Sequence, residues 1–450
     1  MEKKKVLVIT AIVIAVCLLG LIVFWEIKNK TKTEESVNND ESIIVDISKL
    51  SMKIGDNEEN IKIYDVDDYD EFVKDFKESK LAKVYVTKFL YDGAGMYKTY
   101  DLDDFIEEGN DSEVKTMETT VINVNTLGSI ELSGELTGGM VAINTNNLDG
   151  ELRLQLNNVK LDTDSKKIPA IYVYNKDITY SKCKVIIDAK EGTSNYLEGG
   201  KFKKVSLIPI EELSSYSSKY SADAATWYAS YTNYYGVYSK NQISNILFAT
   251  VTADREDLAD GDPYYYYKGS GAISSDIDLY FEGKGSLEVV SKNKEGIETK
   301  GNLSLVGGTG DYVVKAQDDC LNTTTDYSEN SNAHNDLTID VNSLVAVVDL
   351  DADEGDAIDS NGVLTINGGT IFAFAKPGQD AGLDSEKGTY INGGTVLATG
   401  DMYDEIKSDS KQRFIVLSFS NRPTENDTIV LVDSKNSPVF AYKTNRTYSN

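Results

Sequence analysis

Histidine and cysteine are nearly absent from this chain. His334 is the only histidine among 450 residues, and the three cysteines, Cys17, Cys183 and Cys320, lie far apart. A Ser-His-Asp or Cys-His nucleophile and a zinc site all need several such side chains in one place. Two cysteines as distant as Cys183 and Cys320 do not form a disulfide framework either. The sequence therefore excludes hydrolase and zinc chemistry of these kinds.

Positive charge is also scarce. The chain has 45 Lys and Arg against 73 Asp and Glu, a net charge of −28, and no arginine stands between Ser270 and Gly400. Residues 1–30 carry a net +3, so the rest of the chain is at −31 (−28 minus 3). Such a charge disfavours nucleic acid and anionic membrane surfaces. We expect no nucleic-acid partner, and acidic polysaccharides should be repelled unless divalent cations bridge them to the protein.

Only one long run lacks charge: Val6 to Trp25, preceded by Lys3, Lys4 and Lys5. Its length suits a membrane-spanning helix, and the basic flank favours a cytoplasmic N-terminus. A cleaved signal peptide would have a shorter apolar region and a small-residue cleavage site, and no A-x-A follows here. The sequence predicts one transmembrane helix that anchors the protein in the cell membrane, with the globular part extracellular.

A fourteen-residue pattern recurs in the second half of the chain. It reads GIETKGNLSLVGGT at 296–309, AIDSNGVLTINGGT at 357–370 and GLDSEKGTYINGGT at 382–395, and its first half returns at Gly271 and Asp318. Alignment places five apolar residues in one column: Ile273, Ile297, Leu321, Ile358 and Leu383. Their spacings are 24, 24, 37 and 25 residues, and a polar insertion near 323–335 accounts for the longest.

This period, with glycine-rich corners and β-branched runs, is typical of one coil of a parallel β-helix, in which short strands are separated by turns. A β-sandwich is the alternative, but sandwiches rarely repeat the same residues at a fixed period. We therefore expect an all-β, right-handed parallel β-helix (solenoid). The predicted parts are a membrane anchor (1–30), a linker (31–48), an N-terminal cap (49–118), the β-helix (119–400, with a Tyr-rich insertion at 201–268) and a small C-terminal β cap (401–450).

Acidic residues or an amide flank the apolar column in four of its five repeats. The column that follows it holds Glu298, Asn322, Asp359 and Asp384, and the positions before it hold Glu295, Asp319, Asp356 and Asp380. Equivalent residues on neighbouring strands lie about 4.8 Å apart, so these carboxylates would repel one another and raise each other's pKa values. Ca²⁺ binds oxygen ligands at about 2.3–2.6 Å and could bridge two coils. The alternative is a solvated acidic face. The retained register and the neutral oxygen ligand Asn322 favour calcium.

The predicted insertion is rich in aromatic residues. Eleven of the chain's 28 tyrosines lie between Tyr216 and Tyr267, together with Trp227. Exposed tyrosines such as Tyr265 and Tyr266 could stack on sugar rings; alternatively, the segment packs its tyrosines on itself. Upstream, helical spacing over residues 69–80 predicts a helix that covers the first coil. At the C-terminus, FIVLSF, TIVLVD and PVFAY predict an antiparallel cap.

Several segments together resemble a bacterial family of carbohydrate-binding parallel β-helix proteins, described as binding calcium, cellulose and polygalacturonate, with a pectate-lyase-like fold. They are GAISSDIDLYFEGKGSLEVVSKNKEGIETKGNLSLVGGT, QDDCLNT, GDAIDSNGVLTINGGT, GLDSEKGTYINGGT, GSIELSGELTGGMVAINT, LRLQLNNVKL and FIVLSFS. The resemblance covers roughly residues 119 to 443. It implies display at the cell surface, a polysaccharide partner and calcium held by Glu298, Asp318, Asp319, Asp356, Asp359, Asp380 and Asp384. Asn322 and Cys320 depart from the pattern, as do the insertion and the short C-terminal cap.

Fold alone does not decide between binding and catalysis. A calcium-dependent polysaccharide lyase would need calcium to acidify a uronate proton and a basic side chain to remove it. Lys300 and Lys315 lie near the acidic column and are candidate bases, and Lys300 is equally a candidate carbohydrate contact. The lack of arginine in the repeats favours binding over lysis, because a polyuronate site usually needs cations to fix its carboxylates. A purely structural surface spacer is the third possibility.

Overall fold

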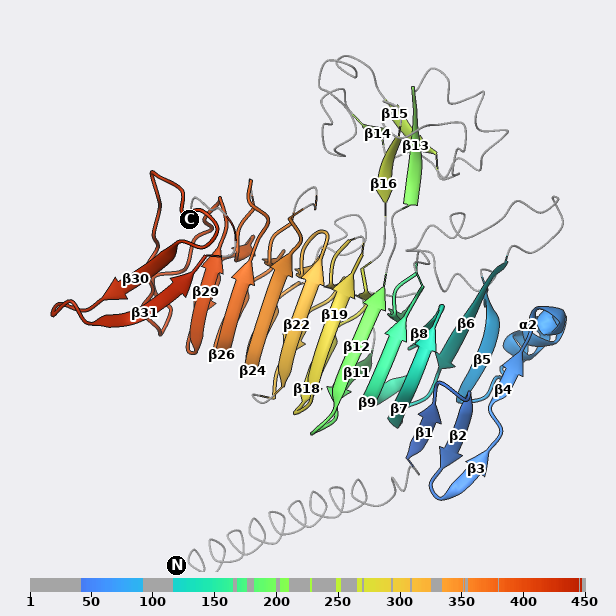
Figure 1. Cartoon of the computed structure of the whole chain (residues 1–450). Helices are drawn as coiled ribbons and strands as arrows, with labels where there is room; N and C mark the ends of the chain where they lie inside the picture. The colour runs from blue at the N-terminus through green and yellow to red at the C-terminus, as the bar shows by residue number, and fades with distance from the viewer. Residues whose placement is uncertain are drawn as a thin grey trace, which may run out of the picture. The chain divides into compact units, whose positions relative to one another are not determined.

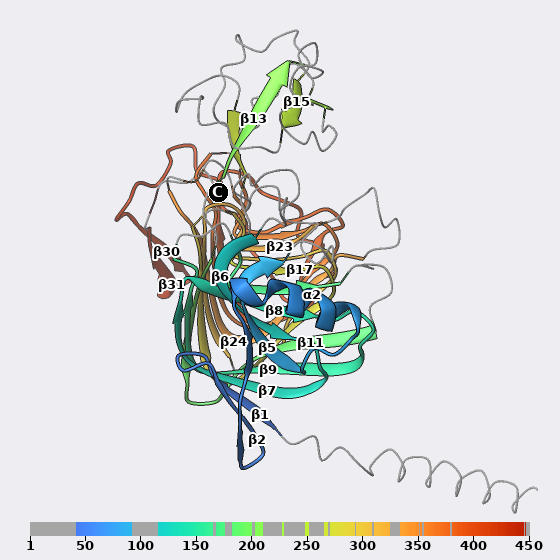
Figure 2. The ribbon, with the colours of Figure 1, turned by 90° about the vertical axis from the view of Figure 1, so that its right-hand side faces the viewer.

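The computed structural model describes residues 42–91, 116–164, 168–175, 182–199, 271–292, 294–307, 310–324, 334–350, 352, 355–378, 380–444 and 446, together with the backbone of four short strands between 203 and 268. Residues 43–450 form one compact unit. Within it, parallel strands lie side by side in chain order (Figure 1) and curve around a common interior when viewed from one end (Figure 2).

Two sheets enclose that interior. The larger sheet contains β1 (Ile43–Asp46), β2 (Ser51–Ile54), β3 (Asn57–Glu59), β7 (Gly128–Thr137), β9 (Asp149–Asp162), β11 (Lys182–Ala189), β12 (Ser194–Gly199), β18 (Leu279–Gly283), β19 (Ser286–Ser291), β21 (Leu303–Leu305), β22 (Asp311–Ala316), β24 (Leu337–Val348), β26 (Leu364–Phe374), β28 (Thr389–Ile391) and β29 (Thr395–Thr399). The smaller sheet contains β4 (Lys62–Tyr64), β5 (Val84–Tyr91), β6 (Thr116–Val124), β8 (Gly139–Asn144), β10 (Ile171–Tyr174), β17 (Ile273–Ser275), β20 (Ile297–Thr299), β23 (Leu321–Thr323), β25 (Ile358–Ser360) and β27 (Asp384–Ser385).

Eight parallel strands of the larger sheet close into a barrel-like ring in the order β9, β11, β18, β21, β24, β22, β19, β12 and back to β9. The ring closes because β9 and β24 are long enough to pair with two strands each; β24 pairs with β21 through its first part and with β22 through its second. This closed arrangement contradicts the expected β-helix of separate short strands. Alternating burial continues along most of Leu337–Val348, so one strand passes round the bend where a turn was expected.

The predicted transmembrane helix is not among the helices that the structure describes. No helix in the described part of the chain is long and apolar enough to cross a membrane. Val6 and Trp25, which bound the predicted span, lie outside the described residues.

The interior is apolar because side chains alternate between the two faces of each strand. The predicted column Ile273, Ile297, Leu321 and Ile358 is fully buried, and Leu383 is 7% exposed. Strand pairing places Ile273 beside Ile297, Ile297 beside Leu321 and Leu321 beside Ile358. The register therefore agrees with the alignment of the repeats, including the polar insertion after the third strand.

The N-terminal end of the smaller sheet is covered by α2 (Tyr69–Lys77), which follows the 3-10 turn η1 (Val66–Asp68). Phe72 on this helix packs with its ring centroid 5.3 Å from that of Tyr64 and 6.2 Å from that of Tyr85. All three side chains are at most 2% exposed. The predicted helix is thus present, although it ends three residues before Lys80.

The remaining strands are antiparallel. The Tyr-rich segment contributes β13 (Lys203–Pro209), β14 (Trp227–Tyr228), β15 (Phe248–Val251) and β16 (Tyr265–Lys268) to a small separate sheet. Near the C-terminus, β30 (Thr428–Val432) pairs with β31 (Pro438–Lys443) as the sequence indicates. The strand predicted for FIVLSF is wrong: residues 414–419 form no strand, and Ile415 is 70% exposed.

Candidate acidic metal site

The acidic column runs along the outer face of the smaller sheet. Pairing sets Ser274 beside Glu298, Glu298 beside Asn322, Asn322 beside Asp359 and Asp359 beside Asp384. Each of these residues follows a buried apolar residue, so strand alternation turns it outward. Five successive strands thus present one polar column, four members of which are acids or an amide.

A second line of acids lies in the turns that lead into these strands. A carboxylate oxygen of Asp319 accepts the backbone N–H of Asp356 at 2.8 Å, and one of Asp356 accepts the N–H of Ala381 at 2.5 Å. Each acid is therefore fixed by the next repeat. The same turn positions hold Glu295 upstream, so the predicted pairs of acids do lie on one surface.

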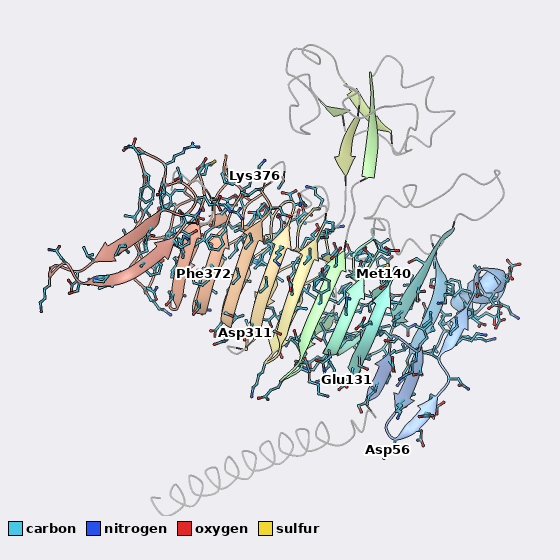
Figure 3. The ribbon with its side chains drawn as sticks, in the orientation of Figure 1. Asp56, Glu131, Met140, Asp311, Phe372 and Lys376 are labelled. Carbon is cyan, nitrogen blue, oxygen red and sulfur yellow. The ribbon has the colours of Figure 1, made fainter. Side chains whose placement is uncertain are left out.

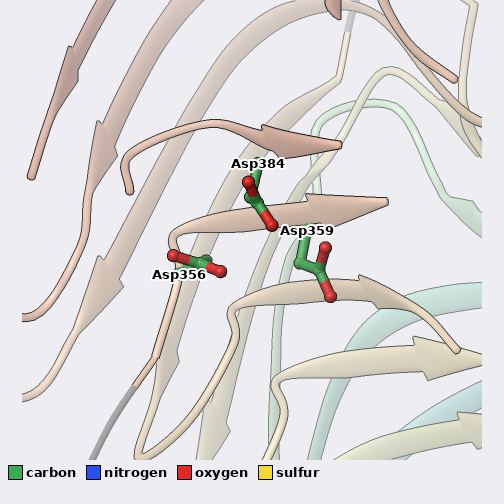
Figure 4. Close-up of side chains that lie close together, drawn as sticks. All are labelled: Asp356, Asp359 and Asp384. Carbon is green, nitrogen blue, oxygen red and sulfur yellow. The ribbon is translucent and has the colours of Figure 1, made fainter. Parts of the chain in front are cut away.

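Three carboxylates converge at the downstream end of this surface. Asp356, Asp359 and Asp384 each offer an oxygen, and these oxygens all lie within 4.8 Å of one another. Figure 4 shows Asp359 and Asp384 on adjacent strands, with Asp356 in the turn that enters the strand of Asp359. An ion bound at about 2.4 Å can contact oxygens up to about 4.8 Å apart. A single calcium ion fits the trio by distance and by its all-oxygen donor set.

Burial and mutual repulsion raise the pKa values of all three acids. Burial, followed by the charge of Asp384, raises the pKa of Asp359 to about 7. Burial is also the main cause that raises the pKa of Asp356 to about 8, against the hydrogen bond from Ala381. The pKa of Asp384 is raised by burial and by Asp404. Protons therefore relieve part of the repulsion that a cation would relieve more completely.

Asn322 lies between the upstream and downstream acids. Its Nδ2 donates to Asp319 Oδ2 at 2.5 Å and to Asp359 Oδ2 at 3.0 Å. The residue is 8% exposed, and its Oδ1 is buried without a hydrogen-bond donor among the described residues. An orphaned buried carbonyl oxygen is costly, and a cation would satisfy it.

A lysine side chain lies among the acids at the upstream end of this surface. Lys294 Nζ contacts the carboxylate of Asp318 and lies 3.8 Å from Glu295 Oε1, while the Ser274 hydroxyl donates to Glu298. Burial nevertheless raises the pKa of Glu295 to about 7, with Glu298 adding to the shift. The sequence interpretation overlooked Lys294, although it stands one period of 24 residues before Asp318.

Asp380 and Asp318 are the remaining predicted ligands. Asp380 is partly buried, and burial raises its pKa against a backbone hydrogen bond from Gly355. It stands one turn position before Ala381, at the edge of the trio. Asp318 is 8% exposed, and its pKa is raised by burial and by Glu295.

The other candidate residues lie apart from the acids. Lys300 Nζ is 3.3 Å from Oδ1 of Asp276, which is 4% exposed and also accepts from the Tyr172 hydroxyl at 2.9 Å. Lys315 pairs with Glu288 at 2.7 Å on the larger sheet. The side chains of Tyr265 and Tyr266 lie outside what the structure describes.

Sequence reasoning also missed a ladder of inward hydroxyls in the smaller sheet. Its members, each one residue after the acidic column, are Ser275, Thr299, Thr323, Ser360 and Ser385. Each is 5% exposed or less and bonds to a nearby oxygen; Thr299 donates to the Ile277 carbonyl at 2.6 Å, for example. The signal was a Ser or Thr at that place in every repeat, and its role is to satisfy turn carbonyls.

Comparisons with known proteins bear on the region that contains these acids. Residues 238–426, fewer than half of the chain, match the model of a family described as carbohydrate-binding domain-containing protein. A comparison with curated proteins finds no match. Among solved structures, the polysaccharide lyase-like protein from C. thermocellum, in a gadolinium derivative, is similar at 16% identity. That match covers 64% of this chain and 94% of the other, with a TM-score of 0.33.

Proposed function

We propose that this protein binds carbohydrate through calcium held by the acidic column of the smaller sheet. The observation that supports it best is the convergence of Asp356, Asp359 and Asp384, whose oxygens lie within 4.8 Å of one another. Calcium prefers several carboxylate and carbonyl oxygens at about 2.3–2.6 Å. These three acids supply such donors from two neighbouring strands and from the turn that leads into the first of them.

The proposed ligand is an acidic polysaccharide of the polygalacturonate type, with a cellulose-like neutral polymer as the alternative. The match of residues 238–426 to a carbohydrate-binding domain supports the ligand class. A protein with a net charge of −28 repels a polyuronate at a distance, so attraction must be local. A bound divalent ion supplies that local positive charge and keeps free coordination positions for ligand carboxylates. Millimolar extracellular calcium suits such a site, and we propose that it acts outside the cell.

The test is polygalacturonate pull-down of the full-length chain across a calcium titration. The parent should bind only when calcium is present, and Asp359→Ala should lose that binding because it removes one of the three converging carboxylates. Glu288→Ala is the matched control, since Glu288 pairs with Lys315 on the larger sheet. Equal binding by Asp359→Ala and the parent at every calcium concentration would refute the proposal.

The same samples separate binding from lysis. A lyase base must be an uncharged amine when it takes the proton. Lys300 Nζ, however, lies 3.3 Å from a carboxylate oxygen of the buried Asp276, so it would have to leave this partner before it could act on a substrate. We therefore expect no unsaturated sugar products in the calcium-loaded samples. The appearance of such products would establish the lyase alternative. Calcium binding without retention of polygalacturonate or of a cellulose-like polymer would favour a surface spacer.

A further inference from the structure

One turn position of the repeat holds a different type of residue from one repeat to the next. Three residues before the buried column stand Lys294, Asp318, Gly355 and Asp380. In a parallel stack these four positions lie along one line, so each can reach the acids of the next repeat. The line thus offers a cation at Lys294, acids at Asp318 and Asp380, and no side chain at Gly355.

Lys294 uses this place to reach across two repeats. Its Nζ contacts the carboxylate of Asp318, 24 residues on, and lies 3.8 Å from Glu295 Oε1 in its own repeat. These two contacts place the Lys294 ammonium between acids of two neighbouring repeats.

The downstream trio receives no cation from this line of positions. The equivalent position there is Gly355, whose φ is +149°. A Cβ at this glycine would lie 2.7 Å from the backbone carbonyl of Asp318. A lysine therefore cannot stand in this repeat, and Asp356, Asp359 and Asp384 have no tethered ammonium from that position.

An unsatisfied oxygen adjoins the upstream acids. Asn322 is in register with Glu298 on one side and with Asp359 on the other. Its Nδ2 donates to Asp319 and Asp359, so the amide nitrogen is engaged by the acids of its own turn and of the next repeat. That Oδ1 is buried and accepts no hydrogen bond from the described residues.

We propose that Lys294 is a built-in cation that takes the place of a second divalent ion beside Glu295, Glu298, Asp318 and the Oδ1 of Asn322. With the lysine in place, the oxygens of these three acids do not converge as those of the downstream trio do. This inference rests on the proposed function. In the downstream repeat Gly355 stands where Lys294 stands upstream, and calcium is proposed to bind there in place of a lysine ammonium. The lysine sets how many ions the column binds. Removing its charge while keeping its length should convert the upstream acids into a metal site.

The experiment compares the full-length parent with Lys294→Met, Lys294→Arg and the control Lys315→Met. Lys315 also pairs with one glutamate, but on the larger sheet. Bound calcium per chain is counted by equilibrium dialysis, and melting is followed in EDTA and in calcium. We expect Lys294→Met to bind one ion more than the parent, to melt lower in EDTA and to recover in calcium. Lys294→Arg and Lys315→Met should bind the parent's number.

Lys294→Met binding the parent's number of ions would overturn the proposal. If that variant folds only in calcium, the proposal is supported, whereas failure to fold in either condition counts against it. The downstream site is judged separately. If the parent and Asp359→Ala bind equal numbers of ions, the proposed function fails, but the Lys294 inference is still decided by the difference between Lys294→Met and the parent.

Discussion

The two sheets treat stacked charge in opposite ways. On the larger sheet, acids are matched by cations: Arg153 bonds Asp188 at 3.0 Å and Glu282 at 2.7 Å, and Lys190 bonds Glu131 at 2.6 Å. Figure 3 shows Glu131 among the side chains that project from this sheet. On the smaller sheet, from Glu298 to Asp384, acids and one amide follow one another in register.

The difference appears in the acids themselves. Burial raises the pKa of Glu131, but hydrogen bonds from Lys190 and Asn157 outweigh it and leave that pKa lowered. On the smaller sheet the neighbours of Asp356 and Asp359 are mostly other acids, and both pKa values rise to between about 7 and about 8. A parallel stack repeats whatever its sequence repeats, so unmatched charge in register indicates a site for an external cation.

The largest effect should come from a matched pair on the smaller sheet. Lys300→Met would leave Asp276, which is 4% exposed, without its ammonium partner. Breaking a buried ion pair on one side costs about 3 kcal/mol. Chemical denaturation in EDTA and in calcium should show the same loss. A loss confined to calcium-loaded protein would instead place Lys300 in the metal site.

Asp359→Ala should have an effect whose sign depends on calcium. In EDTA the variant should be as stable as the parent or more stable, because one repelling carboxylate is gone. In calcium it should lose the ligand's contribution, about 2.7 kcal/mol when calcium is a hundredfold above Kd. The measurement is the free energy of unfolding under both conditions, and a loss of equal size in EDTA and calcium would contradict the repulsion argument.

The calcium-free protein should lose stability as the pH rises. Asp356 and Asp359 have folded pKa values of about 8 and about 7, above the ordinary value of 3.8, so the folded state binds more protons than the unfolded state between pH 4 and 8. Unfolding free energy then falls as pH rises through this window, by at least about 2 kcal/mol, because each unit of pKa shift corresponds to about 1.4 kcal/mol. Melting in EDTA from pH 5 to pH 8 tests this, and rising stability would be inconsistent with it.

The smallest effect is expected on the matched face. Arg153 is 26% exposed in its side chain, and its removal as Arg153→Met should cost about 1 kcal/mol after allowance for solvent screening. The loss should be the same with EDTA and with calcium. If the loss of stability depended on calcium, the larger sheet would also take part in calcium binding, and the contrast between the two sheets would be wrong.

The sequence predicted which acids lie together on one sheet, but it predicted less of the architecture. The register of Ile297, Leu321 and Ile358 followed from the repeat because identical positions stack. The ring did not, because nothing in the repeat shows that Leu337–Val348 continues as one strand past the expected turn. The pairs Lys294–Asp318 and Lys300–Asp276 are each one 24-residue period apart, so the signal existed; whether a flexible lysine reaches its neighbour depends on backbone geometry that spacing does not contain.

Calorimetric titration of calcium into the full-length parent tests the central claim most directly. Because Asp356 and Asp359 hold protons near neutral pH and metal ligands must be deprotonated, calcium should bind saturably, bind more tightly at pH 8 than at pH 6, and release protons as it binds. Proton release is read from titrations in two buffers of different ionisation enthalpy. An absence of saturable binding at millimolar calcium, or binding that neither changes with pH nor releases protons, would contradict the account.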